Sequence, residues 1–62
     1  MKVQYDKNVD VLTIVFSLAP IETSDEERPG LIFDYDREGK IVGIEILEAS
    51  KRLQNPESLP SG

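Results

Sequence analysis

The stretch that decides the fold runs from Leu31 to Leu47 and reads LIFDYDREGKIVGIEIL. Ile, Val, Leu, Phe and Tyr dominate its two arms, and these residue types favour the pleated surface of a β-strand. An acidic turn separates the arms, and Gly39 is the position in it best suited to a positive φ. The pattern predicts two antiparallel strands that form a hairpin.

The loop of this hairpin decides which side chains share a face, because a slip of one residue turns every side chain to the other face. An odd loop of three residues would set Phe33 on the same face as Gly43 and Glu45, which mixes polar and apolar positions. We therefore expect an even loop, either Glu38–Gly39 or Asp36–Gly39. One face would then be wholly apolar and would hold Leu31, Phe33, Tyr35, Val42, Ile44 and Ile46.

The segments before this hairpin predict a fainter copy of it. Residues 2–5 and 11–16 have strand content and flank a polar turn at 6–10, where Asn8 is expected to tolerate the left-handed backbone region. The segment Ile21–Glu27, which is acidic, is either an edge strand or an irregular crossing. A charged edge strand would protect the sheet from aggregation.

The segment after the central hairpin predicts the only helix. Residues 48–53 favour a helix of under two turns, and Asn55-Pro56 ends it because a residue before proline avoids the α region. We therefore expect an α+β fold, in which two hairpins form a small, meander-like antiparallel sheet with one short C-terminal helix. Residues 1–54 would form a single domain, and residues 55–62 a loose tail.

Composition narrows the function classes. The chain of 62 residues has no Cys and no His, so disulfides, thiolate metal sites and the common nucleophile–base pairs are excluded. The net charge of −5 makes nucleic acid and anionic membranes poor partners. No apolar run approaches the ~20 residues of a membrane span, and no secretory signal is present. We expect a cytoplasmic protein that is not an enzyme and carries no cofactor.

The number of apolar side chains in one strand phase predicts association. A short helix that contributes Ala49 and Leu53 cannot cover them, and large apolar patches are rare on soluble monomers. We therefore expect a homo-oligomer, most simply a twofold dimer. The side chains of this phase are Val3, Tyr5, Leu12, Ile14, Phe16, Leu31, Phe33, Tyr35, Val42, Ile44 and Ile46.

The acidic residues support two different expectations. In the first, a small basic protein binds the chain through Asp25, Glu26, Glu27 and Asp36. In the second, the central turn binds a metal or small ligand, because Asp34, Asp36, Glu38 and Glu45 have nearly the spacing of a calcium loop. A hairpin weakens the second expectation, since Asp34 and Glu45 would then lie on strands.

Several strings of the sequence resemble the small bacterial and archaeal family catalogued as domain of unknown function 2283. They are Tyr5-Asp6, DVLTI at 10–14, PGLIFDYD at 29–36, GKIVGIEIL at 39–47 and Ala49-Ser50, and the likeness covers about Met1 to Leu53. The Glu38-Gly39 turn departs from the Asp-Gly common in that family, which weakens the prediction of a tight turn.

The family has no established activity and no assigned catalytic residues, so none are carried over. The resemblance implies a small, stand-alone prokaryotic protein. Members are often encoded beside toxin-like proteins of a proposed ribonuclease class, and some are labelled candidate antitoxins. An acidic chain with exposed apolar surface fits such a neutralising role.

Overall fold

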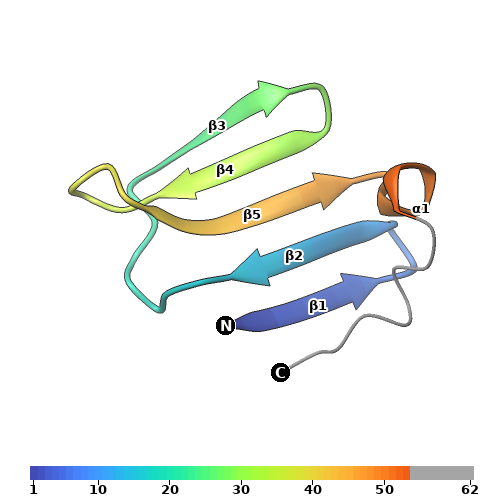
Figure 1. Cartoon of the computed structure of the whole chain (residues 1–62), viewed down its shortest axis with the longest axis horizontal. Coiled ribbons are helices and arrows are strands. Elements are labelled where there is room, and N and C mark those ends of the chain that lie inside the picture. Colours follow the sequence, from blue (N-terminus) through green and yellow to red (C-terminus); the bar gives the residue numbers. More distant parts are fainter. Residues whose placement is uncertain (54–62) are drawn as a thin grey trace.

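Five antiparallel strands and one short helix make up the computed structural model, which describes residues 1–53 (Figure 1). The predicted α+β fold, an antiparallel sheet followed by one short C-terminal helix, is confirmed. The expected helix stop at Asn55-Pro56 and the tail at 55–62 lie outside the described residues. The elements are β1 (Lys2–Asp6), β2 (Val11–Val15), β3 (Thr23–Arg28), β4 (Leu31–Tyr35), β5 (Ile41–Leu47) and α1 (Ala49–Arg52).

The strand order in the sheet is β1-β2-β5-β4-β3, so the longest strand, β5, lies at the centre. The two hairpins β1–β2 and β4–β5 meet where β2 pairs with β5, and that pairing sets Ile14 opposite Ile44. On the other side of β5, Phe33 of β4 also lies opposite Ile44. The apolar phases of both hairpins therefore face the same side of the sheet.

The loop of the central hairpin differs from the even loop that the sequence predicts. The Asp36 amide donates to the Lys40 carbonyl at 2.9 Å, and the Gly39 amide donates to the Asp36 carbonyl at 3.0 Å, which leaves a three-residue loop. Gly39 has φ +82°, as the last residue of such a loop requires. The prediction of an even loop was wrong.

A β-bulge restores the apolar face that the odd loop would have broken. Tyr35 pairs with Ile41 and Asp34 pairs with Gly43, so the register skips Val42. The extra residue shifts the pairing by one position, and Phe33 then lies opposite Ile44 and not opposite a polar residue. The predicted apolar face is correct for Leu31, Phe33, Ile44 and Ile46, but Tyr35 lies opposite Ile41 and Val42 lies in the bulge.

The acidic segment forms the edge strand β3, which decides between the two alternatives left open by the sequence. All six residues of β3 are exposed, and the strand pairs only with β4. Its register shifts between Glu26 and Arg28. Charged side chains and a bulge are both features that protect a sheet edge from further pairing.

Two local predictions for the N-terminal half are wrong. The left-handed residue of the first turn is Asp10, with φ 57°, and not Asn8. The side chain of Asp10 also contacts the helix, as described below. Phe16, predicted for the apolar phase, lies just beyond the end of β2 and is 46% exposed.

Few side chains of residues 1–53 are fully enclosed. The buried apolar residues are Leu12, Val42 and Ala49. The molecule measures 33 × 26 × 16 Å along its principal axes, which is the shape of a slab. In the face-on view the helix lies beyond the strand ends and not across the sheet (Figure 1). No helix within residues 1–53 has the length and apolar content that a membrane crossing needs.

Candidate interaction surface

One face of the sheet presents apolar side chains from four of its strands. Residues opposite one another in neighbouring strands share a face, and the register aligns them in two rows across β1, β2, β5 and β4. Leu12 is buried, whereas the other members are only half-buried. The apolar face, as the term is used below, consists of Val3, Tyr5, Leu12, Ile14, Leu31, Phe33, Ile44 and Ile46.

The helix leaves this face largely uncovered. Ala49 is fully buried, but α1 has only four residues and lies at the end of the sheet (Figure 1). A sheet usually buries its apolar face against a second layer. Residues 1–53 supply no such layer for this face.

Three of the residues predicted to bind a partner lie together on β3. We call Asp25, Glu26 and Glu27 the acidic edge; all are exposed. Asp25 lies opposite Phe33 and is therefore on the side of the apolar face. The Gly30 amide donates to Glu26 Oε2 at 2.8 Å, and the Tyr35 hydroxyl donates to Glu27 Oε2 at 3.0 Å. The bond to Glu27, with burial, raises the pKa of Tyr35 above its usual 10.0.

The fourth predicted partner residue, Asp36, has a different setting. Its Oδ1 accepts hydrogen bonds from the amides of Glu38 at 2.8 Å and Lys40 at 2.9 Å. This carboxylate therefore supports the three-residue loop. A charge reversal at Asp36 would disturb the hairpin, so the residue is unsuited to a binding test that must leave the fold intact.

Two of the predicted metal-binding residues, Asp34 and Glu45, meet on the opposite face of the sheet, which we call the mixed face. Asp34 is only 3% exposed, and the Ser24 hydroxyl donates to its Oδ1 at 2.6 Å. Burial, the charge of Asp34 and a hydrogen bond with it raise the pKa of Glu45 above its usual 4.5. Carboxylates on a sheet face of mixed polarity are expected to be solvated, and Asp34 departs from that expectation because it is buried.

Gly43 makes the burial of Asp34 possible. The two residues are paired across β4 and β5. A Cβ at position 43 would lie 3.1 Å from the Ile14 carbonyl oxygen and 3.2 Å from Asp34 Oδ2. The missing side chain therefore provides the space that the Asp34 carboxylate occupies.

The four predicted metal ligands do not converge. Asp36 holds the loop, and Glu38 lies within 3.9 Å of Lys40 in an exposed ion pair. Among residues 1–53, no three acidic side chains form a group that could hold a metal ion. Metal or ligand binding by Asp34, Asp36, Glu38 and Glu45 stays a prediction that a thermal-shift titration can test.

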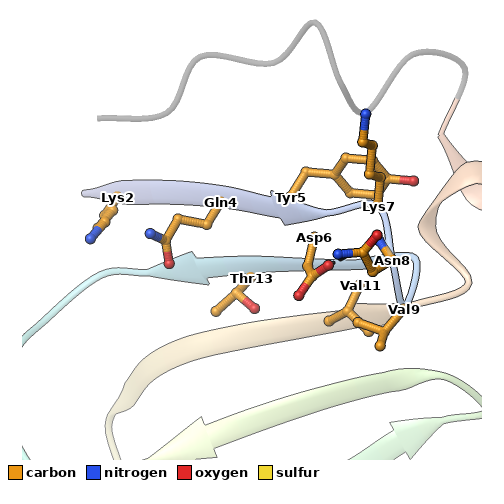
Figure 2. A pocket seen from close by; sticks show the side chains of 9 residues that line it. All are labelled: Lys2, Gln4, Tyr5, Asp6, Lys7, Asn8, Val9, Val11 and Thr13. Atoms are coloured by element: carbon orange, nitrogen blue, oxygen red, sulfur yellow. Dashed lines mark hydrogen bonds between the residues drawn. The ribbon is translucent and has the colours of Figure 1, made fainter.

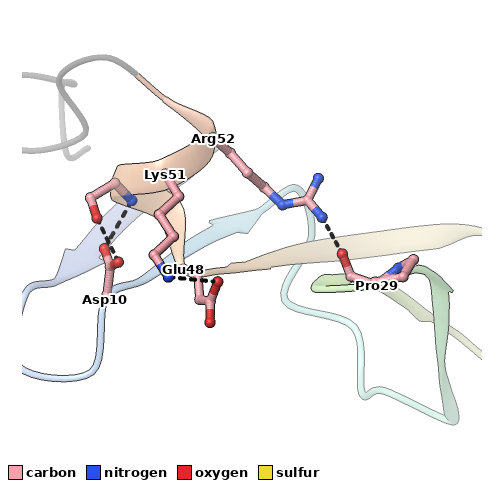
Figure 3. A network of polar contacts seen from close by, with 6 residues as sticks. Asp10, Pro29, Glu48, Lys51 and Arg52 are labelled. Carbon is pink, nitrogen blue, oxygen red and sulfur yellow. Dashed lines mark hydrogen bonds and ion pairs between the residues drawn. The ribbon is translucent and has the colours of Figure 1, made fainter.

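Asp10, which sequence reasoning missed, joins the first turn to the helix (Figure 3). Its Oδ1 accepts from the Ser50 amide at 2.9 Å and the Tyr5 hydroxyl at 2.7 Å, and its Oδ2 accepts from the Ser50 hydroxyl at 2.7 Å. These bonds, the Ser50 hydroxyl first, hold the pKa of Asp10 below its usual 3.8. Glu48, the N-cap, makes no side-chain cap bond, so Asp10 serves as the cap from another segment.

The C-terminal end of the helix is also tied to the sheet. The Arg52 guanidinium donates to the Pro29 carbonyl, and Lys51 lies 3.5 Å from Glu48 (Figure 3). The Arg52 bond and the Asp10 contacts fix α1 at the end of the sheet, whereas the Lys51–Glu48 pair lies within the helix segment. The helix is thereby kept away from the centre of the apolar face.

A shallow hollow of about 840 Å³ lies along the β1–β2 hairpin. Figure 2 shows Lys2, Gln4, Asp6 and Thr13 on one side of the hairpin, with Tyr5 and Lys7 on the other. Most of its lining thus belongs to the polar surface of the mixed face. We assign this hollow no ligand.

Comparison with known proteins gives one match. The family described as Protein of unknown function (DUF2283) matches residues 2–50. No curated protein and no solved structure matches the chain. The resemblance recognised in the sequence is therefore confirmed over most of its length.

Proposed function

The chain belongs to the DUF2283 family of proteins of unknown function, and on this premise we propose that it is a non-enzymatic interaction protein. Its apolar face binds a second polypeptide. The observation that carries this proposal is that seven of the eight apolar-face residues are only half-buried in residues 1–53.

Energetics support binding at this face. Full burial of an Ile, Leu or Phe side chain contributes about 1.5–3 kcal/mol relative to exposure. A domain of ~60 residues has a small core and marginal stability. Covering several half-buried side chains would therefore stabilise the fold by an amount comparable with its total stability.

The simplest partner is a second copy of the chain, because a twofold dimer covers both apolar faces with one contact. A narrower proposal concerns a different partner, a small basic protein that contacts the acidic edge. The net charge of −5 and the exposure of Asp25 support it. In that role the chain would act in the cytoplasm as the neutralising, antitoxin-like half of a pair.

Neighbouring residues of β4 provide a matched test of the apolar face. Phe33 lies on this face and Ile32 on the mixed face, and both are half-buried. We expect Phe33→Ser to convert the associated form to monomer in size-exclusion chromatography, while Ile32→Ser keeps the associated form. Circular dichroism checks that both variants fold. Equal elution of the two folded variants would count against the proposal.

A second experiment tests the narrower proposal. The tagged protein is used to capture partners from nuclease-treated native lysate, at low and at high salt. We expect a small basic protein that is retained at low salt, lost at high salt, and lost with Asp25→Lys. Glu38→Lys, which changes the net charge equally in an exposed turn, is the control. Loss with both variants would show a nonspecific charge effect and refute a site on β3.

A further inference from the structure

We propose that β1 of one copy pairs antiparallel with β1 of a second copy, about a twofold axis that passes between the two Gln4 residues. This contact uses an edge of the sheet and not the apolar face, so it goes beyond the function proposed above. Two observations carry it: the direction of the backbone groups at this edge, and the charges of the strand, which are complementary to a second copy of themselves.

The two edges of the sheet differ in how well they could accept another strand. β1 and β3 are the outer strands (Figure 1). The β3 edge has a shifted register and carries the like charges of the acidic edge. In contrast, β1 pairs with β2 without a shift from Lys2 to Asp6. A regular outer strand is a template for pairing with a further strand.

Two residues of β1 direct their backbone groups away from β2. The Phe16 amide, just after β2, donates to the Val42 carbonyl at 2.8 Å, which is on the β5 side. Because successive residues of an antiparallel strand alternate in direction, the even-numbered residues of β2 bond to β5 and the odd-numbered ones to β1. The register pairs those odd-numbered residues with positions 2, 4 and 6 of β1. The amide and carbonyl groups of Val3 and Tyr5 therefore point outward from the edge.

The residues of β1 are complementary to a second copy that runs in the opposite direction. When the whole strand overlaps, Val3 lies opposite Tyr5 of the second copy, and their outward backbone groups form reciprocal hydrogen bonds. Lys2 lies opposite Asp6 of the second copy at both ends of the contact, and Gln4 lies opposite itself. Lys2, Gln4 and Asp6 are exposed and point to one side of the hairpin (Figure 2). Opposite charges in directly opposed positions stabilise a sheet.

Other registers lose this match. Moving the second copy by two residues keeps the outward backbone groups opposed, but it places Gln4 opposite Lys2 or Asp6 and leaves the charges of the strand without an opposite charge. Lys7, the next charged residue, points to the other side of the hairpin, with Tyr5 (Figure 2). In the proposed register the residue opposite it is Met1, whose side chain is uncharged. The charges at this edge therefore favour one register.

The contact would join two sheets into one. A twofold axis perpendicular to the sheet keeps both apolar faces on the same side, with the β1 strands at the centre and the acidic edges at the two margins. Few backbone hydrogen bonds hold such a contact, so it is weak and separates on dilution in chromatography. At high protein concentration it would double the apolar surface that one assembly offers to a partner.

A disulfide across the axis tests the contact directly. The two Gln4 residues would form a pair without mutual backbone hydrogen bonds, in which the Cα atoms are about 4.5 Å apart, within the range of a disulfide. Because the chain has no Cys, Gln4→Cys carries a single thiol. We expect Gln4→Cys at high concentration to form a disulfide-linked dimer under mild oxidation, as measured on a non-reducing gel.

Lys2→Cys is the matched control, because it places a thiol at an exposed position of the same strand and the same face. Two such thiols would lie about 14 Å apart along the strands, at ~3.4 Å for each of the residues between them. Lys2→Cys should therefore form a disulfide only when it is mixed with Asp6→Cys. Lys2→Glu in the Gln4→Cys background should slow the disulfide, whereas Lys40→Glu, the same change of charge at an exposed side chain of another turn, should not.

The opposite results overturn the inference, provided that circular dichroism shows each variant to be folded. No disulfide in Gln4→Cys, or equal amounts in Gln4→Cys and in Lys2→Cys alone, would show that the edges do not pair. A disulfide in Gln4→Cys without one in the mixture of Lys2→Cys and Asp6→Cys would refute the register. Phe33→Ser, which tests the apolar face, should leave the Gln4→Cys disulfide unchanged, so failure of this contact is distinguishable from failure of the proposed function.

Discussion

Replacement of Gly43 by alanine tests the buried Asp34 carboxyl most sharply. The new Cβ would lie 3.1 Å from the Ile14 carbonyl oxygen, which belongs to the neighbouring strand and cannot retreat without loss of sheet pairing. It would also lie 3.2 Å from Asp34 Oδ2, whose carboxyl is bonded to Ser24. Both neighbours are therefore held in place, and the clash must be relieved by strain.

The expected magnitude follows from two opposing effects. Overpacking of a well-packed site costs typically about 1–3 kcal/mol. Alanine also restricts the unfolded chain more than glycine does, which stabilises the folded state by about 0.5–1 kcal/mol. The difference between these ranges is about 0–2.5 kcal/mol, so Gly43→Ala should lower the free energy of unfolding by about 1 kcal/mol, which for a domain of this size lowers Tm by roughly 4–8 °C.

Urea unfolding followed by circular dichroism measures this change at a fixed protein concentration. Asp34→Ser in the Gly43→Ala background removes Oδ2 and should restore part of the loss, so that the two substitutions are not additive. A Gly43→Ala variant as stable as the unmodified chain would refute the argument that Gly43 makes room for the carboxyl.

Three further predictions concern single side chains. The pKa of Glu45 is raised, so the native state binds its proton more tightly than the unfolded chain does. This contribution to stability is lost as pH rises above the usual value of 4.5. Glu45→Gln should therefore stabilise the protein at pH 7 and have less effect near pH 4, as measured by urea unfolding at both pH values. The pKa of Asp10 is lowered, so its contribution to stability is present above the usual pKa of 3.8 and is lost as pH falls through the folded pKa. Asp10→Asn, which keeps the left-handed backbone accessible, should weaken the Ser50 contacts and flatten the decrease of stability at acid pH. An unchanged decrease of stability at acid pH would contradict this. Leu12, at 2% exposure, is the largest fully enclosed side chain among the described residues. Leu12→Ala should lower the free energy of unfolding by about 2–5 kcal/mol and leave much of the protein unfolded at 25 °C. A native circular dichroism spectrum with an unchanged Tm would argue against a core at this position.

The elements of the fold could be predicted because their signal is local. Strand content and alternation located β1, β2, β4 and β5, and the acidic stretch was correctly considered as an edge strand. The common face of the two hairpins also followed from the phase of the apolar residues. These features depend on residue type and spacing, which the sequence displays directly.

The alternation of apolar residues alone could not distinguish the observed loop and its bulge in the central hairpin from an even loop without a bulge. A three-residue loop with a bulge at Val42 and a two-residue loop without a bulge both set Phe33 opposite Ile44. Gly39 fits either form. The distinction depends on backbone hydrogen bonds between Asp36 and Lys40, which no residue pattern specifies.

The roles of Asp34 and Asp10 depend on tertiary contacts and were missed for that reason. Asp34 is buried because a glycine on the next strand lies opposite it. Asp10 caps a helix that begins at Ala49, and the Ser50 amide that donates to it lies forty residues later in the chain. A signal did exist for the first: Gly43 interrupts a strand of large residues, and a glycine in a strand interior often marks a close approach by another group.

Sedimentation equilibrium of the unmodified chain tests the central claim most directly, because it measures mass without labels or substitutions. The chain mass is 7.0 kDa. If the apolar face is an interface between copies, the apparent mass at micromolar concentration should approach twice that value and fall on dilution. A mass of one chain that does not change across the accessible concentrations, for a protein that is folded by circular dichroism, would contradict the claim.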